Sequence, residues 1–143
     1  MKAPRRAQIY IDGACSGNPG PAGIGVVIFV DGSSSPTRQL SRYLGHATNN
    51  IAEYLALVYA LQEAVQLRCE VVAVRTDSEL LVRQVQGRYK VRDEVLQLLH
   101  GLIGHLTPAF QSMRIEHIPR ERNTLADRLA TDAIQFARVS IAH

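Results

Sequence analysis

The sequence predicts an α/β domain built on a mixed five-stranded sheet, with helices on both faces of that sheet. Three observations lead to this fold class. The first 45 residues hold three β-rich runs, apolar residues then repeat with helical spacing from about residue 50, and two later β-rich runs alternate with further helical segments. The predicted order is therefore βββαβααβα. Helical crossovers join parallel strands, so the first, fourth and fifth strands are expected to be parallel.

The first 45 residues predict an antiparallel meander of three strands. Gln8–Asp12 forms the first strand and stops at a turn-rich loop over Gly13–Pro21. Ile24–Val30 is a second β-rich run, and the Asp31-Gly32 pair that follows it is a hairpin signal. Thr37–Leu44 supplies the partner strand.

Helices and strands alternate in the remainder of the chain. Helical spacing predicts a helix over Asn50–Leu67, and the β-branched run that opens Val71–Thr76 predicts a strand buried on both faces. Ser78–Gln86 fits a short helix that Gly87 ends. An apolar stripe predicts the next helix, and its members are Val91, Val95, Leu98, Leu99, Leu102 and Leu106.

The last two predicted elements are a strand over Met113–Ile118, which Pro119 closes, and a helix over Thr124–Ala137. Small side chains recur along one face of this last helix, at Ala126, Ala130, Ala133 and Ala137. Such a face suits close packing against another element.

Composition bounds the class of protein. With 143 residues and 46% hydrophobic content, the chain is predicted to be a single domain, 1–143, whose ends at 1–6 and 140–143 fray. No apolar run approaches the ~18 residues that cross a membrane, and no signal peptide is visible. Two cysteines are too few to staple a domain. We expect a reduced, cytoplasmic monomer with no membrane contact and no obligate protein partner.

The charge gives a weak indication of the partner. The net charge is +3, from 16 basic and 13 acidic residues, and all but two of the basic residues are arginine. Because the guanidinium fork matches phosphate oxygens, this bias favours nucleic acid, although many proteins with other functions share it.

Four carboxylates occupy positions that need an explanation. Asp12 and Asp77 each end a strand that is expected to be buried, and α/β sheets bind ligands beyond the carboxyl ends of parallel strands. Two carboxylates side by side at such an edge repel each other unless a cation lies between them. Glu53 and Asp127 would lie in the first turns of helices at the same end of the sheet. Together the four favour Mg²⁺ ions, which prefer oxygen ligands.

Each acid also has an ordinary structural explanation. Glu53 fits the third position of a capping box opened by Asn50. Asp77 is a candidate N-cap, Asp127 suits the positive start of a helix, and Asp12 marks a strand end before a turn. For one acid alone the structural explanation is favoured, and the conjunction of all four favours a metal site.

These residues lie in motifs that resemble those of type 1 ribonuclease H. The first runs over Tyr10–Gly20 (YIDGACSGNPG), the second over Thr48–Glu53 (TNNIAE), the third over Thr76–Ser78 (TDS) and the fourth over Asn123–Asp127 (NTLAD). All four occur in order across nearly the whole chain. The resemblance implies a single domain with the ribonuclease H-like fold, in the compact form that lacks a basic protrusion.

The resemblance also implies an activity, the hydrolysis of the RNA strand of RNA–DNA hybrids by two-metal-ion cleavage, giving 5′-phosphate and 3′-hydroxyl ends. It implies two Mg²⁺ ions, with Mn²⁺ able to substitute, held by catalytic acids that match Asp12, Glu53, Asp77 and Asp127. Positions with a role at the substrate match Cys15, through its backbone, and Asn18, Thr48 and Asn49. Short amides and hydroxyls suit the 2′-hydroxyls of a shallow minor groove. Turn and cap chemistry is the alternative explanation for the last three.

The chain departs from the family pattern at three places. Glu79 stands where many members have Gln, and a carboxylate is a poor neighbour for phosphates. In many members, a mobile His in the loop before the last helix helps the product leave. This chain has no His in that loop, so Arg120 is the candidate substitute. His117 is expected to lie within a strand. A Lys-rich helix and loop are also missing, and the basic residues in their place are Arg88, Lys90 and Arg92.

Two other functions are compatible with the fold. One is a non-catalytic domain that binds hybrid or duplex, and the four intact acids argue against it because metal-free acids beside phosphates weaken binding. The other is a different nuclease or an integrase. Asn18 and the Asn49-Asn50 pair favour a 2′-hydroxyl reader instead.

Overall fold

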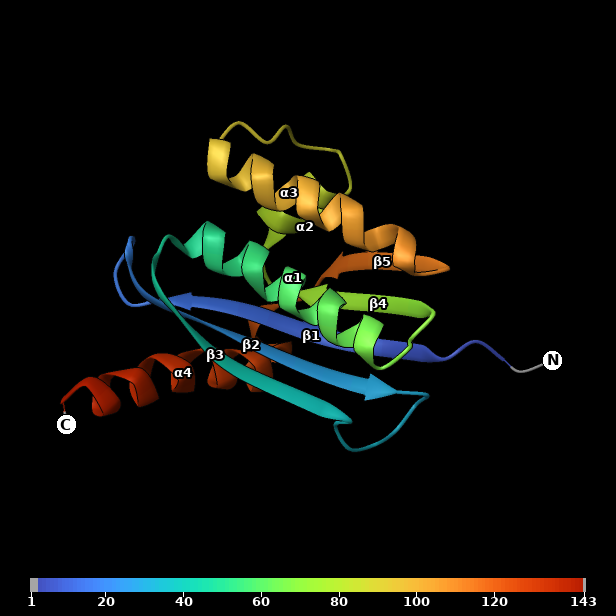
Figure 1. Cartoon of the computed structure of the whole chain (residues 1–143), viewed down its shortest axis with the longest axis horizontal. Helices are drawn as coiled ribbons and strands as arrows, with labels where there is room; N and C mark the ends of the chain where they lie inside the picture. The colour runs from blue at the N-terminus through green and yellow to red at the C-terminus, as the bar shows by residue number, and fades with distance from the viewer. Residues whose placement is uncertain (1–2, 143) are drawn as a thin grey trace.

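The computed structural model describes residues 3–142, with side chains described through Ala137. One mixed sheet with strand order β3-β2-β1-β4-β5 carries helices on both faces (Figure 1). The α/β fold class and the predicted element order are confirmed. The elements are β1 Arg6–Cys15, β2 Gly20–Val30, β3 Arg38–Ala47, α1 Asn49–Gln66, β4 Val71–Thr76, α2 Glu79–Val85, α3 Glu94–Leu106, the 3₁₀ turn Thr107–Ala109, β5 Ser112–His117, the 3₁₀ turn Arg120–Arg122 and α4 Thr124–Ala142.

Strand pairing brings two chain segments to the same edge of the sheet. β1 runs antiparallel to β2 and parallel to β4, and β4 runs parallel to β5. The parallel register of β1 with β4 ends at Ile11 and Thr76. The next residues, Asp12 and Asp77, therefore follow the last paired positions of two neighbouring strands.

The first two strands are longer than predicted. Gly13–Cys15 continues β1, and β2 begins at Gly20, so the predicted loop over Gly13–Pro21 shortens to the turn 16–19. The reason is the antiparallel register, which pairs Gly13 with Ile24 and Cys15 with Ala22. Residues with strong turn propensity thus lie inside a hairpin whose pairing outweighs that propensity.

Only part of the apolar stripe predicted for α3 lies on its buried face. Asp93 caps the helix by accepting a hydrogen bond from the Leu96 N–H (3.0 Å), so the helix begins at Glu94 and excludes Val91. Leu96 and Ile103 are buried, whereas Leu98 is 76% exposed. The packing of α3 against α1 selects the face that is buried, and helical spacing alone does not specify it.

The fraying expected at both chain ends stays a prediction. Arg6 belongs to β1, and the Arg5 carbonyl accepts hydrogen bonds from the N–H groups of Glu70 (2.7 Å) and Val71 (3.1 Å). The backbone of 140–142 continues α4 past the predicted end at Ala137. Residues 1, 2 and 143, for which fraying was also predicted, lie outside the described residues. Among helices of the described segment, none combines the length and the apolar character needed to cross a membrane.

Two glycines let a helix approach the sheet closely on each face. A Cβ on Gly13 would lie 2.4 Å from the Ala52 carbonyl carbon, so α1 contacts β1 backbone to backbone. A Cβ on Gly25 would lie 2.1 Å from the Ala126 carbonyl oxygen of α4. The small-residue face predicted for this last helix is confirmed, because Ala126 and Ala130 are fully buried against the sheet.

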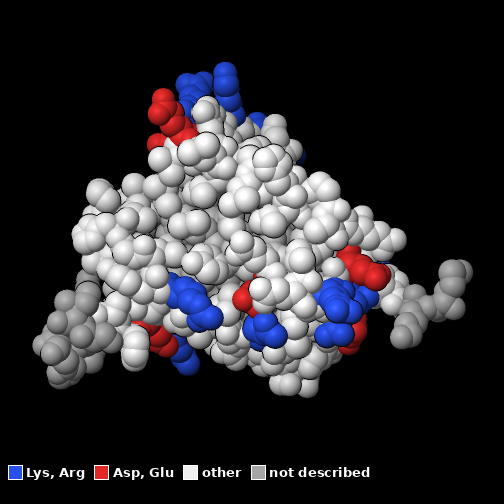
Figure 2. Space-filling view, viewed as in Figure 1, with Lys and Arg blue, Asp and Glu red and all other residues white. Residues whose placement is uncertain are grey.

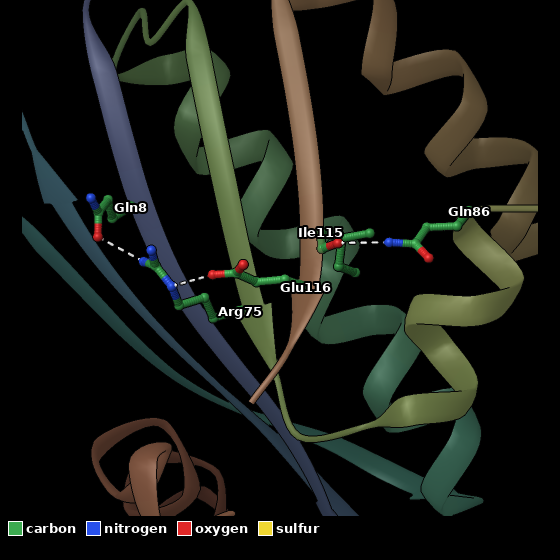
Figure 3. Close-up of polar contacts among 5 residues, drawn as sticks. All are labelled: Gln8, Arg75, Gln86, Ile115 and Glu116. Carbon is green, nitrogen blue, oxygen red and sulfur yellow. Dashed lines mark hydrogen bonds and ion pairs between the residues drawn. The ribbon is translucent and has the colours of Figure 1, made fainter. Parts of the chain in front are cut away.

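Side-chain contacts hold β4 and β5 in place (Figure 3). Arg75 of β4 donates from Nη1 to Gln8 Oε1 of β1 and from Nε to Glu116 Oε1 of β5, both over 2.7 Å. On the outer edge of β5, Gln86 Nε2 donates to the Ile115 carbonyl over 3.0 Å. These contacts fix the strand that leads into the connection before α4.

The close approach of α4 predicts the effect of Gly25→Ala. The added methyl group overlaps the Ala126 carbonyl, so the substitution is expected to lower the free energy of unfolding by about 1–3 kcal/mol in urea titrations. Gly101→Ala is the matched control, since its Cβ meets nothing within 4 Å and the exchange should stabilise α3 by about 0.5–1 kcal/mol. Equal stability of Gly25→Ala and the parent would contradict this packing argument.

Candidate active site

The four predicted carboxylates converge on one cavity of about 440 Å³. Asp12 lies near the end of β1, Asp77 directly follows β4, Glu53 projects from α1 and Asp127 lies in the first turn of α4. One oxygen from each of Asp12, Glu53 and Asp77 can be chosen so that the three lie within 4.8 Å of one another. A larger hollow of about 500 Å³ lies between α3 and β5, but none of these acids lines it.

Glu53 is held by the glycine that brings α1 onto β1. The Gly13 N–H donates to Glu53 Oε1 over 2.7 Å, and the residue is only 4% exposed. Its second oxygen, Oε2, is buried without a hydrogen-bond partner. A buried carboxylate oxygen that lacks a donor is a natural ligand for a cation.

Burial and mutual repulsion disturb the ionisation of two acids in the metal-free protein. Burial, followed by the charge of Glu53, raises the pKa of the Asp12 carboxyl. Burial likewise raises the pKa of Glu53, although the hydrogen bond from Gly13 opposes that shift. The site therefore holds more protons than the same carboxyls would in water.

The donor set fits hard divalent cations. Carboxylate oxygens are the ligands that Mg²⁺ prefers, and the ion pairs within residues 3–137 use other acids, namely Glu63, Glu79 and Glu116. Asp12, Glu53, Asp77 and Asp127 are thus the residues that would hold such ions.

The ordinary explanations for the acids apply only in part. Thr48, not Asn50, caps α1, with its hydroxyl accepting from the Ile51 N–H (3.2 Å), so Glu53 belongs to no capping box there. Ser78, not Asp77, caps α2. Asp127 does lie in the first turn of α4, where a negative charge also suits the helix dipole.

The other predicted residues divide into two groups. Arg120, Cys15 and Asn49 line the cavity with the acids, whereas Asn18 and Thr48 do not. Asn18 Oδ1 instead accepts a hydrogen bond from the Asn49 N–H over 3.0 Å, which ties the turn before β2 to the start of α1. The Cys15 thiol donates to the Ala47 carbonyl over 3.0 Å and so joins β1 to the end of β3.

Two departures from the family pattern are explained by neighbouring side chains. Glu79 pairs with Arg83, one turn further along α2, with Nη2 and Oε1 2.7 Å apart, and this contact lowers the pKa of the Glu79 carboxyl. His117 lies within β5, as predicted, although it is the last residue of that strand, and it lines a small hollow beside Glu79 rather than the acidic cavity. Arg120 therefore shares a cavity with the acids, whereas His117 lines a different hollow.

Sequence reasoning missed several residues of the site. Gly13, Ser78 and Thr131 line the cavity, and the buried Asn123 bonds to the β1 residue before Asp12. Position within the first, third and fourth motifs was a signal for Gly13, Ser78 and Asn123. Thr131 carries no motif, and only its place one helical turn after Asp127 could have indicated it.

The α2–α3 connection carries the basic residues expected there. No helix lies between Val85 and Glu94, in keeping with the compact form, and Arg88, Lys90 and Arg92 are all exposed. Lys and Arg side chains gather over this connection at the top of the view in Figure 2, beside acidic ones. Buried Gln84 holds the connection by donating to the Lys90 carbonyl over 3.2 Å.

Comparison with known proteins places this geometry in a family. A family model described as "Reverse transcriptase-like" matches residues 10–133. The ribonuclease H of Chlorobium phaeobacteroides is 33% identical, over 94% of this chain and 99% of its own length. The chain belongs to the type 1 ribonuclease H family. Its motifs therefore mark the same four segments that the fold brings together.

Solved structures support the same family assignment. The N-terminal RNase H domain of Rv2228c from Mycobacterium tuberculosis is 42% identical, with a TM-score of 0.87 over 90% of this chain and 98% of that one. LC11-RNase H1, solved in complex with an RNA/DNA hybrid, is 43% identical, with a TM-score of 0.86 over 92% and 98%. The whole bifunctional protein Rv2228c is longer, and the match spans 38% of its length.

The buried acids predict how pH affects stability in the absence of metal. Raised folded-state pKa values contribute stability that is fully present below the ordinary carboxyl values of 3.8 and 4.5 and is lost as pH rises through the folded values. In EDTA the Tm should therefore fall from pH 5 to pH 8. Asp12→Asn should flatten that fall and raise the Tm at pH 8, by about 2–4 °C for each ~1 kcal/mol relieved.

The Tm values are measured by differential scanning calorimetry in EDTA, and the series includes a control variant. Glu121→Gln removes a carboxyl from the nearby 3₁₀ turn that does not line the cavity, so it should leave the slope of Tm against pH unchanged. A fall in the Tm of Asp12→Asn in EDTA at pH 8 would contradict the repulsion argument.

Proposed function

We propose that this ribonuclease H chain is a metal-dependent endonuclease that hydrolyses the RNA strand of RNA–DNA hybrids and leaves 5′-phosphate and 3′-hydroxyl ends. The observation that carries the proposal is the close set of acid oxygens from Asp12, Glu53 and Asp77, open to one cavity with Asp127. Family membership and the hybrid complex of the similar LC11-RNase H1 support the choice of substrate. Two Mg²⁺ ions are the proposed cofactors, with Mn²⁺ able to substitute.

The four acids reach the cavity from different depths and from different parts of the fold. Bound Mg²⁺ ions would supply activation of the attacking water and stabilisation of the leaving 3′ oxygen. Asp12 and Glu53 lie deepest and hold their oxygens rigidly, because β1 and α1 touch at Gly13. Asp77 and Asp127 come from the other two elements and complete the acidic wall. These positions leave the cavity mouth for the phosphodiester backbone.

Substrate contacts are proposed around that mouth. Asn49 lines the cavity directly, while Asn18 and Thr48 fix the start of α1 that presents it. Cys15 acts through its backbone and by joining β1 to β3. The exposed basic residues of the α2–α3 connection suit a second stretch of phosphates. A single domain over 1–143, a monomeric state and a cytoplasmic location stay predictions.

A cleavage assay tests the proposed activity. In Mg²⁺ the protein should cut the RNA strand of a hybrid and leave an all-DNA duplex intact, and 2′-deoxy substitutions around one phosphate should protect that phosphate. Asp77→Asn should reduce cutting to the metal-free background while the protein stays folded by circular dichroism.

The other candidate functions give different results in the same assay. Salt-sensitive binding of the hybrid without cleavage would identify a non-catalytic binding domain, and equal cutting of the DNA duplex would identify another nuclease of this fold. Normal turnover by folded Asp77→Asn would exclude the proposed metal site.

Arg120 is proposed to act on the scissile or product phosphate. It is exposed at the start of the 3₁₀ turn before α4 and lines the cavity with the acids. A guanidinium donates hydrogen bonds and carries charge but does not accept a proton in the working pH range. Arg120 can therefore attract a phosphate, whereas a general-base role is excluded by its chemistry.

Arg120→Ala should lower turnover without abolishing it. The four acids remain, so we expect a loss of up to roughly 10²-fold in single-turnover or steady-state rates. Arg122→Ala is the matched control from the same turn, since it does not line the cavity and should stay near the parent rate. Unchanged rates for Arg120→Ala, with a loss in His117→Ala, would show that the histidine serves this role instead.

A further inference from the structure

The connection between β5 and α4 holds the residues that precede two of the acids. At its start, the Ile118 N–H donates to the Thr76 carbonyl over 2.9 Å, and Asp77 follows Thr76. At its end, Asn123 Nδ2 donates to the Ile11 carbonyl over 2.8 Å, and Asp12 follows Ile11. Ile11 and Thr76 are the last paired residues of β1 and β4, so one short segment spans the point where their pairing ends.

Asn123 also directly precedes α4, the helix that carries a third acid. Its carbonyl accepts a hydrogen bond from the Asp127 N–H over 3.1 Å, and its own N–H donates to the Arg120 carbonyl over 2.9 Å. Asn123 is thus hydrogen-bonded to the residue before Asp12, to the backbone of Asp127 and to the backbone of Arg120.

The side chain of Asn123 is not arranged for stability alone. It is 1% exposed, yet its Oδ1 has no hydrogen-bond partner. A buried acceptor without a donor costs free energy, and a residue kept only for packing would be apolar. The polar group of this side chain that has a partner is the Nδ2 donor, which bonds to the Ile11 carbonyl.

We propose that Asn123 is the positioning residue of the acidic site, fixing Asp12 against Asp127 through its bond to the Ile11 carbonyl. The inference rests on the proposed metal site but not on the identity of the nucleic acid. Residues that orient metal ligands from behind change metal affinity when they are replaced, by roughly 10–100-fold in known sites. A residue that only packs changes stability instead.

The test is Mn²⁺ binding to the full chain by isothermal titration calorimetry, without nucleic acid. Asn123→Leu keeps a side chain of similar shape but removes the donor, and Asn123→Ala removes both shape and donor. Both variants should bind Mn²⁺ roughly 10–100-fold more weakly than the parent. In the hybrid assay both should lower kcat more than they raise KM, because the substrate contacts at Asn49 are untouched.

Gln86→Ala is the matched control. It removes the same kind of bond, from a side-chain amide to a strand carbonyl, on the outer edge of β5 (Figure 3). Its Mn²⁺ affinity should equal that of the parent. Recovery of parental affinity in Asn123→Leu but not in Asn123→Ala would show a packing role and overturn the proposal.

A measurement on the unsubstituted protein covers the case in which the variants do not fold. The Asn123 side-chain amide should give a protected ¹⁵N–¹H signal that shifts on Mg²⁺ titration with the same midpoint as the Gly13 amide. A signal that exchanges freely with solvent, or one that Mg²⁺ leaves unmoved, would overturn the proposal. Weaker Mn²⁺ binding by the variants of a protein that cuts no hybrid would support the positioning role while removing the proposed function.

Discussion

Backbone contact between helices and sheet at two glycines is the constraint on which the site depends. Gly13 lets α1 touch β1, and Gly25, the cross-strand partner of Asp12, lets α4 touch β2. A side chain at either position would separate the helix from the sheet. Because Glu53 and Asp127 project from these two helices, the same contacts that complete the packing also bring the acids to the end of β1.

This packing gathers charge that the protein would otherwise keep apart. Asp12 and Glu53 are each about 95% buried, and burial raises the pKa of both carboxyls. Strands, helices and the Asn123 bond prevent the acids from moving away from one another. The fold therefore carries an electrostatic cost in the metal-free state, and a bound cation relieves it, as is common where stability is exchanged for function.

The sequence was sufficient for elements whose signals are local. The element order and the cluster of four acids follow from periodicity and from motifs at element ends. Features that depend on distant contacts did not follow. Leu98 belongs to a regular apolar stripe yet faces solvent, because packing against α1 selects another face. Asn123 was visible only as part of a motif, because its partner Ile11 lies 112 residues away.

Four elements from distant parts of the chain each supply one acid, which links metal binding to the whole fold. A cation held by Asp12, Glu53, Asp77 and Asp127 would contact β1, α1, the segment after β4 and α4 together, so it binds only when all four are assembled. A ligand that binds the folded state alone stabilises it by mass action, by about 2.7 kcal/mol at a hundredfold excess over Kd. Metal bound at this site would therefore stabilise global folding rather than order one loop.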